Sequence, residues 1–220
     1  MARMARVIAP GIAHHITQRG NRRQLTFFCE SDYKIYLQLM SEFCNRYHVE
    51  IWAYCLMPNH VHLVAVPETE DGLRRAIGEA HRKYTRMIHF REGWRGHLWQ
   101  GRFASYPMDN LHTIAAVRYI ELNPVRAGLV ERPEEWPWSS VRSHFAGEND
   151  VLVNVAPMLG EIGDWSRFLM ESVRADIFRR HELTGRPLGG ADFIQHLERT
   201  LDRVLIKRKP GPKHCEGSDK

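Results

Sequence analysis

Two histidines at alternate positions, His60 and His62, are the strongest candidates for chemistry in this sequence of 220 residues. They belong to the segment Pro58-Asn59-His60-Val61-His62-Leu63, whose alternation of apolar and polar residues predicts a β-strand. Residues two apart on a strand point to the same face of a sheet. The two imidazoles can therefore bind one divalent metal ion, for which neutral histidine is a good ligand. The alternative is that both rings lie on a solvated sheet face.

Tyr119 and Asn123 form a second candidate pair, four residues apart in a predicted helix. Residues at this spacing share a helix face, so both side chains can point into one site. A tyrosine hydroxyl can attack a phosphodiester and form a covalent phosphotyrosine, which keeps the energy of the broken bond and allows rejoining without ATP. The Asn123 carbonyl oxygen can add a ligand to a metal ion that stabilises charge on the scissile phosphate. Alternatively, Tyr119 is a core residue and Asn123 only ends the helix before Pro124.

Basic residues interleaved with aromatic ones are typical of surfaces that bind single-stranded nucleic acid, and residues 72–106 have this composition. The segment contains Tyr84, a rival nucleophile because cationic neighbours can lower the pKa of a phenol; we favour a core or base-stacking role for it. Arginines beside Gly20 form a second basic segment that can contact phosphates or base edges. The candidate DNA-binding residues are Arg19, Arg22, Arg23, Arg82, Lys83, Arg86 and Arg102.

The composition agrees with a protein that acts on nucleic acid. The formal net charge is +5, with 43% hydrophobic and 26% charged residues, which is ordinary for a globular protein with an anionic partner. The longest run without a charged residue contains Pro58 and His60, which excludes a membrane span. The N-terminal residues lack the apolar stretch of a signal peptide, which favours a cytoplasmic location. No GxxxxGK[ST] motif is present, so no nucleoside triphosphate is expected as a partner.

The elements that must position these residues follow the order β-α-β-β-α-β-α. Residue patterns predict strands over 11–17, 49–57, 60–66 and 98–108, and helices over 32–47, 71–90 and 110–123. The Pro58-Asn59 pair predicts a tight turn between the middle strands. The first six elements match a split βαβ arrangement. We therefore expect an α+β protein with a ferredoxin-like core, an antiparallel sheet with helices on one face.

The composition changes after Arg126, which suggests three parts to the chain. We expect a catalytic domain over residues 1–130, a connector rich in proline and tryptophan over 131–160, and a mainly helical C-terminal extension over 161–220. Within the extension, helices are predicted over 161–182 and 191–206, followed by a basic tail from Lys207 to Lys213. Cysteines 29, 44, 55 and 215 form no CxxC pair and are expected to be reduced thiols; His14 and His15 are expected to be ordinary strand residues.

Three blocks of the sequence together resemble a known family. They are Leu56-Met57-Pro58-Asn59-His60-Val61-His62-Leu63, Leu98-Trp99-Gln100-Gly101-Arg102-Phe103, and Tyr119-Ile120-Glu121-Leu122-Asn123-Pro124-Val125-Arg126-Ala127-Gly128. In this order they look like the REP-associated tyrosine transposases, which are part of the IS200/IS605-like group of HUH single-strand nucleases. The opening His15-Ile16-Thr17-Gln18-Arg19-Gly20-Asn21 also fits, and the resemblance covers roughly residues 5–145.

The resemblance implies roles for individual residues. His60 and His62 match the metal-binding histidines of the family, which use Mg²⁺ or Mn²⁺, and Tyr119 matches the nucleophile that forms a 5′-phosphotyrosine and frees a 3′-hydroxyl. Asn123 falls where relatives carry a polar residue, often Gln, on the tyrosine helix. The implied DNA targets are REP hairpins with a short tetranucleotide beside the stem, and the basic loop over residues 19–23 is expected to recognise that tetranucleotide.

The sequence thus predicts a metal-dependent single-strand DNA endonuclease and strand transferase for DNA transposition or recombination, acting at the nucleoid as a monomer or a homodimer. Affinity for DNA should fall steeply with salt. The first alternative is a non-catalytic DNA-hairpin binding regulator on the same fold. The second is a metal-dependent hydrolase that uses activated water and leaves no protein–DNA adduct.

Overall fold

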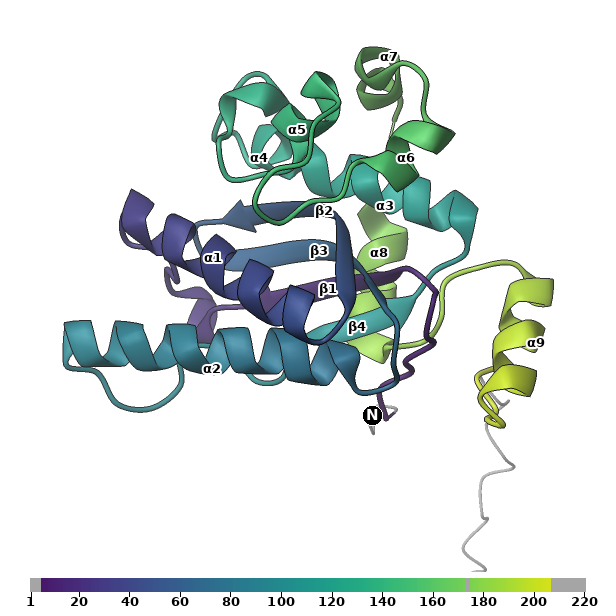
Figure 1. The fold of residues 1–220 in the computed structure, drawn as a ribbon, viewed down its shortest axis with the longest axis horizontal. Helices are drawn as coiled ribbons and strands as arrows, with labels where there is room; N and C mark the ends of the chain where they lie inside the picture. The colour runs from purple at the N-terminus through teal and green to yellow at the C-terminus, as the bar shows by residue number, and fades with distance from the viewer. Residues whose placement is uncertain (1–4, 173–174, 207–220) are drawn as a thin grey trace, which may run out of the picture.

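A four-stranded antiparallel sheet lies at the centre of the computed structural model, which describes residues 5–172 and 175–206. The strands are β1 (His14–Arg19), β2 (Val49–Met57), β3 (His60–Pro67) and β4 (Ala104–Pro107), in the order β2-β3-β1-β4 (Figure 1). This is the strand order of a split βαβ, ferredoxin-like domain, so the predicted fold is confirmed. Pro58 and Asn59 form the predicted turn between β2 and β3.

The two helices of the core cover one face of this sheet. Helix α1 (Glu30–Arg46) and helix α2 (Gly72–Glu92) pack side by side in front of the strands (Figure 1). Val61 and Leu63 of β3 point to this face and lie in the same apolar core as residues of both helices. Because side chains alternate along a strand, His60 and His62 must point to the opposite face.

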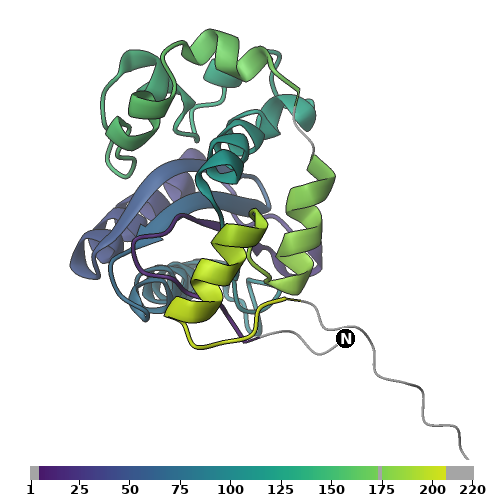
Figure 2. The ribbon, with the colours of Figure 1, turned by 90° about the vertical axis from the view of Figure 1, so that its right-hand side faces the viewer.

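A third helix and the extension cover the second face, which buries the sheet on both sides. Helix α3 (Asn110–Glu121) and helix α8 (Ala175–Thr184) lie across the sheet from α1 (Figure 2). Phe178 of α8 and Trp165 belong to the same apolar core as Met57 and Tyr106 of the sheet. The extension therefore shares a hydrophobic core with the strands and with the helix that carries Tyr119.

Shorter elements complete the described part of the chain. They are the 3-10 helices η1 (Asn21–Arg23) and η2 (Pro133–Glu135) and the helices α4 (Asn123–Arg126), α5 (Val141–Ala146), α6 (Ala156–Glu161), α7 (Trp165–Met170) and α9 (Ala191–Thr200). Val7 and Ala9 near the N-terminus pack against Leu197 and Leu205 in and after α9. No helix in the described ranges is long and apolar enough to cross a membrane.

Three predicted elements are wrong in extent. The expected helix over 161–182 is two helices, because Asp164 caps the start of α7 and Glu171 adopts an extended conformation that ends it. The helix expected over 191–206 ends at Thr200, because the chain then turns to place Leu205 against Leu197. The expected strand over 98–108 begins only at Ala104, since Gly101 has a φ of +153°, which a strand does not allow. The predicted tail over 207–213 and Cys215 lie outside the described residues.

Candidate active site

A cavity of about 850 Å³ opens on the sheet face that carries the paired histidines. It brings together residues from the ends of β1 and β3, the tyrosine helix, the loop before β4 and the extension. Its polar lining includes Thr17, Gln18, Arg19, Arg23, His60, His62, Gln100, Arg102, Tyr119, Asn123, Arg126, Arg179 and Glu182. The sequence-predicted histidines, tyrosine and asparagine thus lie in one pocket.

His60 and His62 are held side by side by the β3 strand. Their ring centroids are 5.0 Å apart, and β1 pairs opposite them, with Arg19 beside His60 and Thr17 beside His62. Burial lowers the pKa of His60 to about 4, and the positive charge of Arg19 adds to this effect. Burial also places the pKa of His62 well below its usual range, with His60 contributing. Both rings are therefore neutral at neutral pH, the form that binds metal ions.

His15, on the neighbouring strand β1, is a member of this site that sequence reasoning missed. Its Nε2 lies 3.1 Å from Nδ1 of His62, and its Nδ1 lies 2.6 Å from the hydroxyl of Tyr106. The Tyr106 hydroxyl in turn donates to the carbonyl oxygen of Phe178 at 3.4 Å. One assignment of protons accounts for all of these hydrogen bonds. His62 Nδ1–H donates to His15 Nε2, His15 Nδ1–H donates to the Tyr106 oxygen, and the Tyr106 hydroxyl donates to Phe178. This assignment leaves Nε2 of His62 with a free lone pair.

Tyr119 faces the histidines from helix α3. Its ring centroid lies 5.7 Å from that of His62, and it stacks on Phe178 of α8 at 4.8 Å. The residue is only 5% exposed. Burial raises the pKa of Tyr119, and Glu182 adds to this, whereas Arg126 and Arg179 lower it. The arginines therefore favour the phenolate that a nucleophilic tyrosine needs.

Asn123 lies in the pocket at the start of α4, but its side chain is partly engaged. Its Oδ1 accepts a hydrogen bond from Arg126 at 3.2 Å, and its buried Nδ2 has no partner among the described residues. The unpaired amide nitrogen leaves a buried hydrogen-bond donor without a protein partner beside the pocket. Its oxygen has a second lone pair, which remains available to a metal ion.

Glu182 of α8 is the second residue that sequence reasoning missed. Its buried Oε1 has no hydrogen-bond partner in the described part of the chain. A carboxylate oxygen of Glu182 and a ring nitrogen from each of His15 and His62 lie within 4.8 Å of one another. Burial raises the pKa of Glu182 to about 7, although Arg19 and Arg179 oppose the shift. No motif marks this residue in the sequence, because it lies in the extension and reaches the site only through the packing of α8.

These donors fit a divalent ion. The neutral imidazoles of His60 and His62 and the half-buried, unpaired carboxylate of Glu182, with the Asn123 amide oxygen in the same pocket, form a donor set that such an ion accepts. The open cavity leaves room for phosphate oxygens. His60 and His62 would hold the ion, which would polarise a bound phosphodiester.

The predicted DNA-binding residues divide into two groups. Arg19, Arg23 and Arg102 line the pocket, with Arg22 next to them in η1. Arg126 and Arg179 also line it and were not predicted as site residues.

The second group lies on the exposed side of α2, across the sheet from the pocket, and comprises Arg82, Lys83 and Arg86. Arg82 pairs there with Glu79 at 2.6 Å, and Lys83 with Glu42 at 3.4 Å. Tyr84 also lies outside the pocket, fully buried, with its hydroxyl donating to the Thr26 carbonyl at 2.6 Å.

A ferredoxin-like domain with a histidine pair, a facing tyrosine and an arginine-lined pocket is the arrangement that the resemblance of the sequence blocks predicts. The family described as "Transposase IS200 like" matches residues 10–123, which is more than half of the chain. The chain therefore belongs to the IS200-like transposase family, and the expected family membership is confirmed.

Two relatives and one solved structure show the same likeness. A candidate REP-associated tyrosine transposase of Haemophilus influenzae is 32% identical over 48% of this chain and 66% of its own length, just under two thirds. The REP-associated tyrosine transposase of Escherichia coli is 26% identical over 53% of this chain and 67% of its own length. The structure of a REP-associated tyrosine transposase bound to a REP hairpin covers 70% of this chain and 93% of its own, with a TM-score of 0.54 and 23% identity. This last likeness concerns the fold.

Proposed function

We propose that this protein cuts and rejoins single-stranded DNA at REP-type hairpins through a covalent bond to Tyr119. The observation that carries the proposal is the position of Tyr119, whose ring faces the buried, neutral His62 across the pocket at 5.7 Å. The related proteins named as REP-associated tyrosine transposases, and the one bound to a REP hairpin, support the choice of DNA substrate. Chromosomal DNA would make the cytoplasmic nucleoid its place of action.

The reaction needs a nucleophile, charge stabilisation and a leaving group. The Tyr119 phenolate oxygen attacks the scissile phosphorus, the bond from phosphorus to the 3′-oxygen breaks, and that oxygen takes up a proton to become a free 3′-hydroxyl. The product is a 5′-phosphotyrosine, and the reverse attack by a 3′-hydroxyl rejoins the strand. A Mg²⁺ or Mn²⁺ ion held by His60 and His62 would supply Lewis-acid polarisation of the phosphate.

The arginines of the pocket suit a polyanionic substrate. Arg19 ends β1, Arg23 lies in η1, Arg102 lies in the loop before β4, and Arg179 belongs to α8; all four line the pocket. We expect these side chains to bind the phosphate backbone, so that hairpin affinity falls steeply as salt rises. Arg126 lies next to Tyr119 and stabilises charge on the tyrosine oxygen.

The test is a denaturing gel with a labelled single-stranded hairpin taken from the protein's own genome, in Mn²⁺ or Mg²⁺. We expect a protein-linked band that is lost in Tyr119→Phe and with EDTA, while hairpin binding remains. Tyr84→Phe is the matched control, because it removes the same atom from a tyrosine outside the pocket, and it should retain the band. Binding without any adduct would support the regulator instead, and cleavage that survives Tyr119→Phe would support a hydrolase that uses water.

A further inference from the structure

We propose that Glu182, in helix α8 of the C-terminal extension, is a ligand of the divalent metal ion together with His60 and His62. The proposal rests on the proposed function and deepens it, because it assigns a further ligand to the same site. Glu182 lies outside residues 10–123, the part of the chain that matches the family. The extension would then take part directly in the chemistry of the site.

Hydrogen bonding decides which atoms of the cluster formed by His15, His62 and Glu182 are free to bind a metal ion. His15, His62 and Glu182 place donor atoms within 4.8 Å of one another. Both nitrogens of His15 are occupied, one by His62 and one by the Tyr106 hydroxyl. His15 is therefore a positioning residue that fixes the ring of His62, and the remaining free donors are Nε2 of His62 and the carboxylate of Glu182.

The Glu182 carboxylate has no other partner to explain its position. No hydrogen bond or ion pair joins it to any residue within 5–172 and 175–206, and its Oε1 is buried without a partner. Arg19 and Arg179 influence it only as nearby charges. The side chain as a whole is half-buried, but a carboxylate oxygen shielded from water without a partner is costly, so its presence in the pocket points to a cation that the pocket binds.

The Glu182 carboxylate lies close to one of the two paired histidines. One of its oxygens is within 4.8 Å of a ring nitrogen of His62, and the His62 ring lies 5.0 Å from that of His60, centroid to centroid. Two donor atoms bound to one Mg²⁺ or Mn²⁺ ion, each at about 2.1 Å, lie at most about 4.2 Å apart, so binding would draw these groups together. Helix α8 is fixed near the site by Phe178, one helical turn before Glu182, which stacks on Tyr119 and packs edge-on against His15. The same contacts therefore set the positions of the nucleophile and the proposed ligand.

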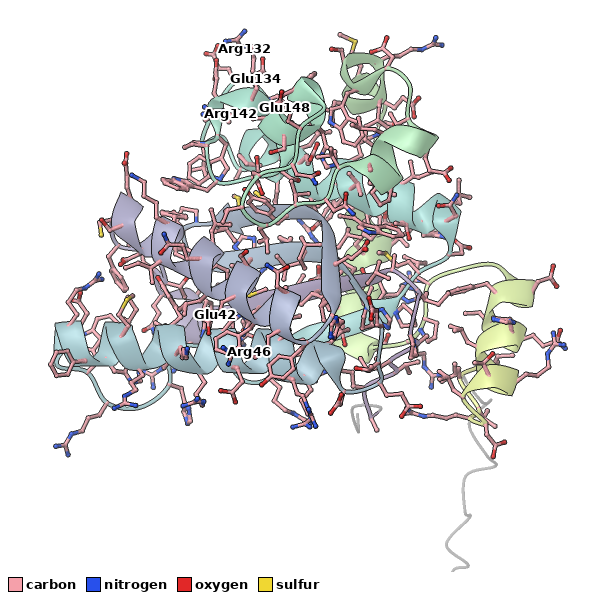
Figure 3. The ribbon with its side chains drawn as sticks, in the orientation of Figure 1. Glu42, Arg46, Arg132, Glu134, Arg142 and Glu148 are labelled. Carbon is pink, nitrogen blue, oxygen red and sulfur yellow. The ribbon has the colours of Figure 1, made fainter. Side chains whose placement is uncertain are left out.

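The experiment measures Mn²⁺ binding by isothermal titration calorimetry on the full chain, without DNA. We expect Glu182→Gln to weaken Mn²⁺ binding by about 10- to 100-fold or more, since losing a direct ligand should cost at least as much as losing a ligand's supporting partner. Glu182→Asp, which keeps the carboxylate, should recover part of the affinity. Glu148→Gln is the matched control, because it removes the same charge from an exposed residue beyond α5, away from α8 (Figure 3), and it should bind like wild type.

Thermal unfolding in EDTA shows whether each variant is folded. Glu182→Gln should unfold at the same temperature as wild type or higher, because it removes a buried unpaired charge. His62→Ala serves as the reference for loss of the site. If His62→Ala abolishes Mn²⁺ binding while Glu182→Gln leaves it unchanged, Glu182 is not a ligand and the proposed function stands. If wild type binds no Mn²⁺, both the ligand and the metal dependence of the proposed function are wrong.

Discussion

The guanidinium of Arg126 lies over the ring of Tyr119, with its central carbon 4.1 Å from the ring centroid, and one of its N–H groups donates to the Tyr119 backbone carbonyl at 2.8 Å. The two residues belong to consecutive helices, α3 and α4, which meet at Leu122. The Asn-Pro pair that begins α4 therefore turns the chain so that a cation returns over the tyrosine. Burial lowers the pKa of Arg126, so holding a cation at this place costs free energy.

Arg126→Met tests whether this cation activates the nucleophile. The substitution keeps an unbranched side chain over the ring but removes the charge that lowers the pKa of Tyr119, so that pKa should rise further. We expect adduct formation at neutral pH to slow by about tenfold, the factor for a cation–π contribution of about 1.4 kcal/mol. Single-turnover formation of the protein–DNA adduct across pH 6 to 10 measures this, and the profile should move to higher pH.

Arg142→Met is the control for that series. Arg142 is exposed on α5, where it donates to the backbone carbonyl of Glu134 (Figure 3). Its loss should leave the pH profile of adduct formation in place. An Arg126→Met profile that overlays wild type would mean that the stacked arginine has only a structural role.

The chain of contacts from His62 through His15 to Tyr106 yields a second prediction. His15→Phe keeps an aromatic ring against Tyr119 and Phe178 but leaves Nδ1 of His62 without its partner. We expect Mn²⁺ affinity to fall about 10- to 100-fold, the usual effect of losing a residue that orients a metal-binding histidine. Titration calorimetry gives the affinity directly.

Tyr106→Phe removes a hydrogen bond of the same series, but one that lies a residue further from the proposed metal site. It removes the group that accepts from His15 Nδ1 but leaves His15 beside His62. Its effect on Mn²⁺ affinity should therefore be smaller than that of His15→Phe. Equal, wild-type-like affinity in both folded variants would exclude a positioning role for His15.

The sequence predicts those site residues whose positions follow from the residue pattern of a single strand or helix. The alternation of β3 places His60 and His62 on one sheet face. Tyr119 and Asn123 do line the same pocket, but the predicted helix over 110–123 ends at Glu121, so Asn123 reaches the pocket from the start of α4 and not from the helix that carries Tyr119. The βαββαβ order is likewise local, because each element carries its own apolar pattern and the Pro58-Asn59 turn sets one pairing.

The remaining site residues depend on contacts between distant segments. His15 meets His62 only because of the antiparallel register between β1 and β3, and Arg179 and Glu182 meet the site only because Phe178 packs α8 on the sheet. No spacing in the sequence reports such a contact. The loop before β4 was predicted as strand because its apolar residues resemble one, whereas the positive φ of Gly101 and the hydrogen bond from Gln18 to its carbonyl hold it as a loop.

The buried histidines predict a loss of stability in mild acid. Burial lowers the pKa of His81 to about 3 and that of His14 to about 4, whereas both titrate near 6.5 in the unfolded chain. The unfolded state therefore binds more protons below pH 6.5, so stability is complete above that value and falls as the pH drops toward 4. Each ring should cost on the order of 2 kcal/mol between pH 6.5 and 5. Urea unfolding at several pH values measures the slope.

The His81→Gln variant isolates the contribution of one buried histidine to this loss of stability in acid. His81 lies on the buried side of α2, where its Nε2 is 2.8 Å from the Tyr36 hydroxyl of α1, and it does not line the pocket. The variant should start less stable at pH 7 and lose stability more gradually on acidification than wild type. His48→Gln, at an exposed ring, should follow the wild-type curve. Parallel pH curves for wild type and His81→Gln would contradict the assignment of this ring as a buried neutral group.

Two glycines predict opposite effects of the same substitution. A Cβ at Gly20 would lie 2.3 Å from the carbonyl oxygen of Gln24 and 2.8 Å from the methyl group of Thr26, whereas a Cβ at Gly78, in the middle of α2, meets nothing within 4 Å. Gly20→Ala should therefore displace the basic loop and lower the free energy of unfolding by about 1 to 3 kcal/mol. Gly78→Ala should raise it by about 0.5 to 1 kcal/mol, because alanine favours a helix interior. Urea unfolding compares the two.

The Gly20→Ala and Gly78→Ala variants also show whether the shape of the basic loop matters for DNA binding. The loop after Gly20 carries Arg22 and Arg23, both held at positive φ by the backbone turn that the glycine begins. Fluorescence anisotropy with a labelled hairpin should show weaker binding for Gly20→Ala at a temperature where the variant is still folded, and unchanged binding for Gly78→Ala. A Gly20→Ala protein that is less stable but binds the hairpin as wild type does would remove this loop from the DNA-binding surface and leave that role to the arginines around Tyr119.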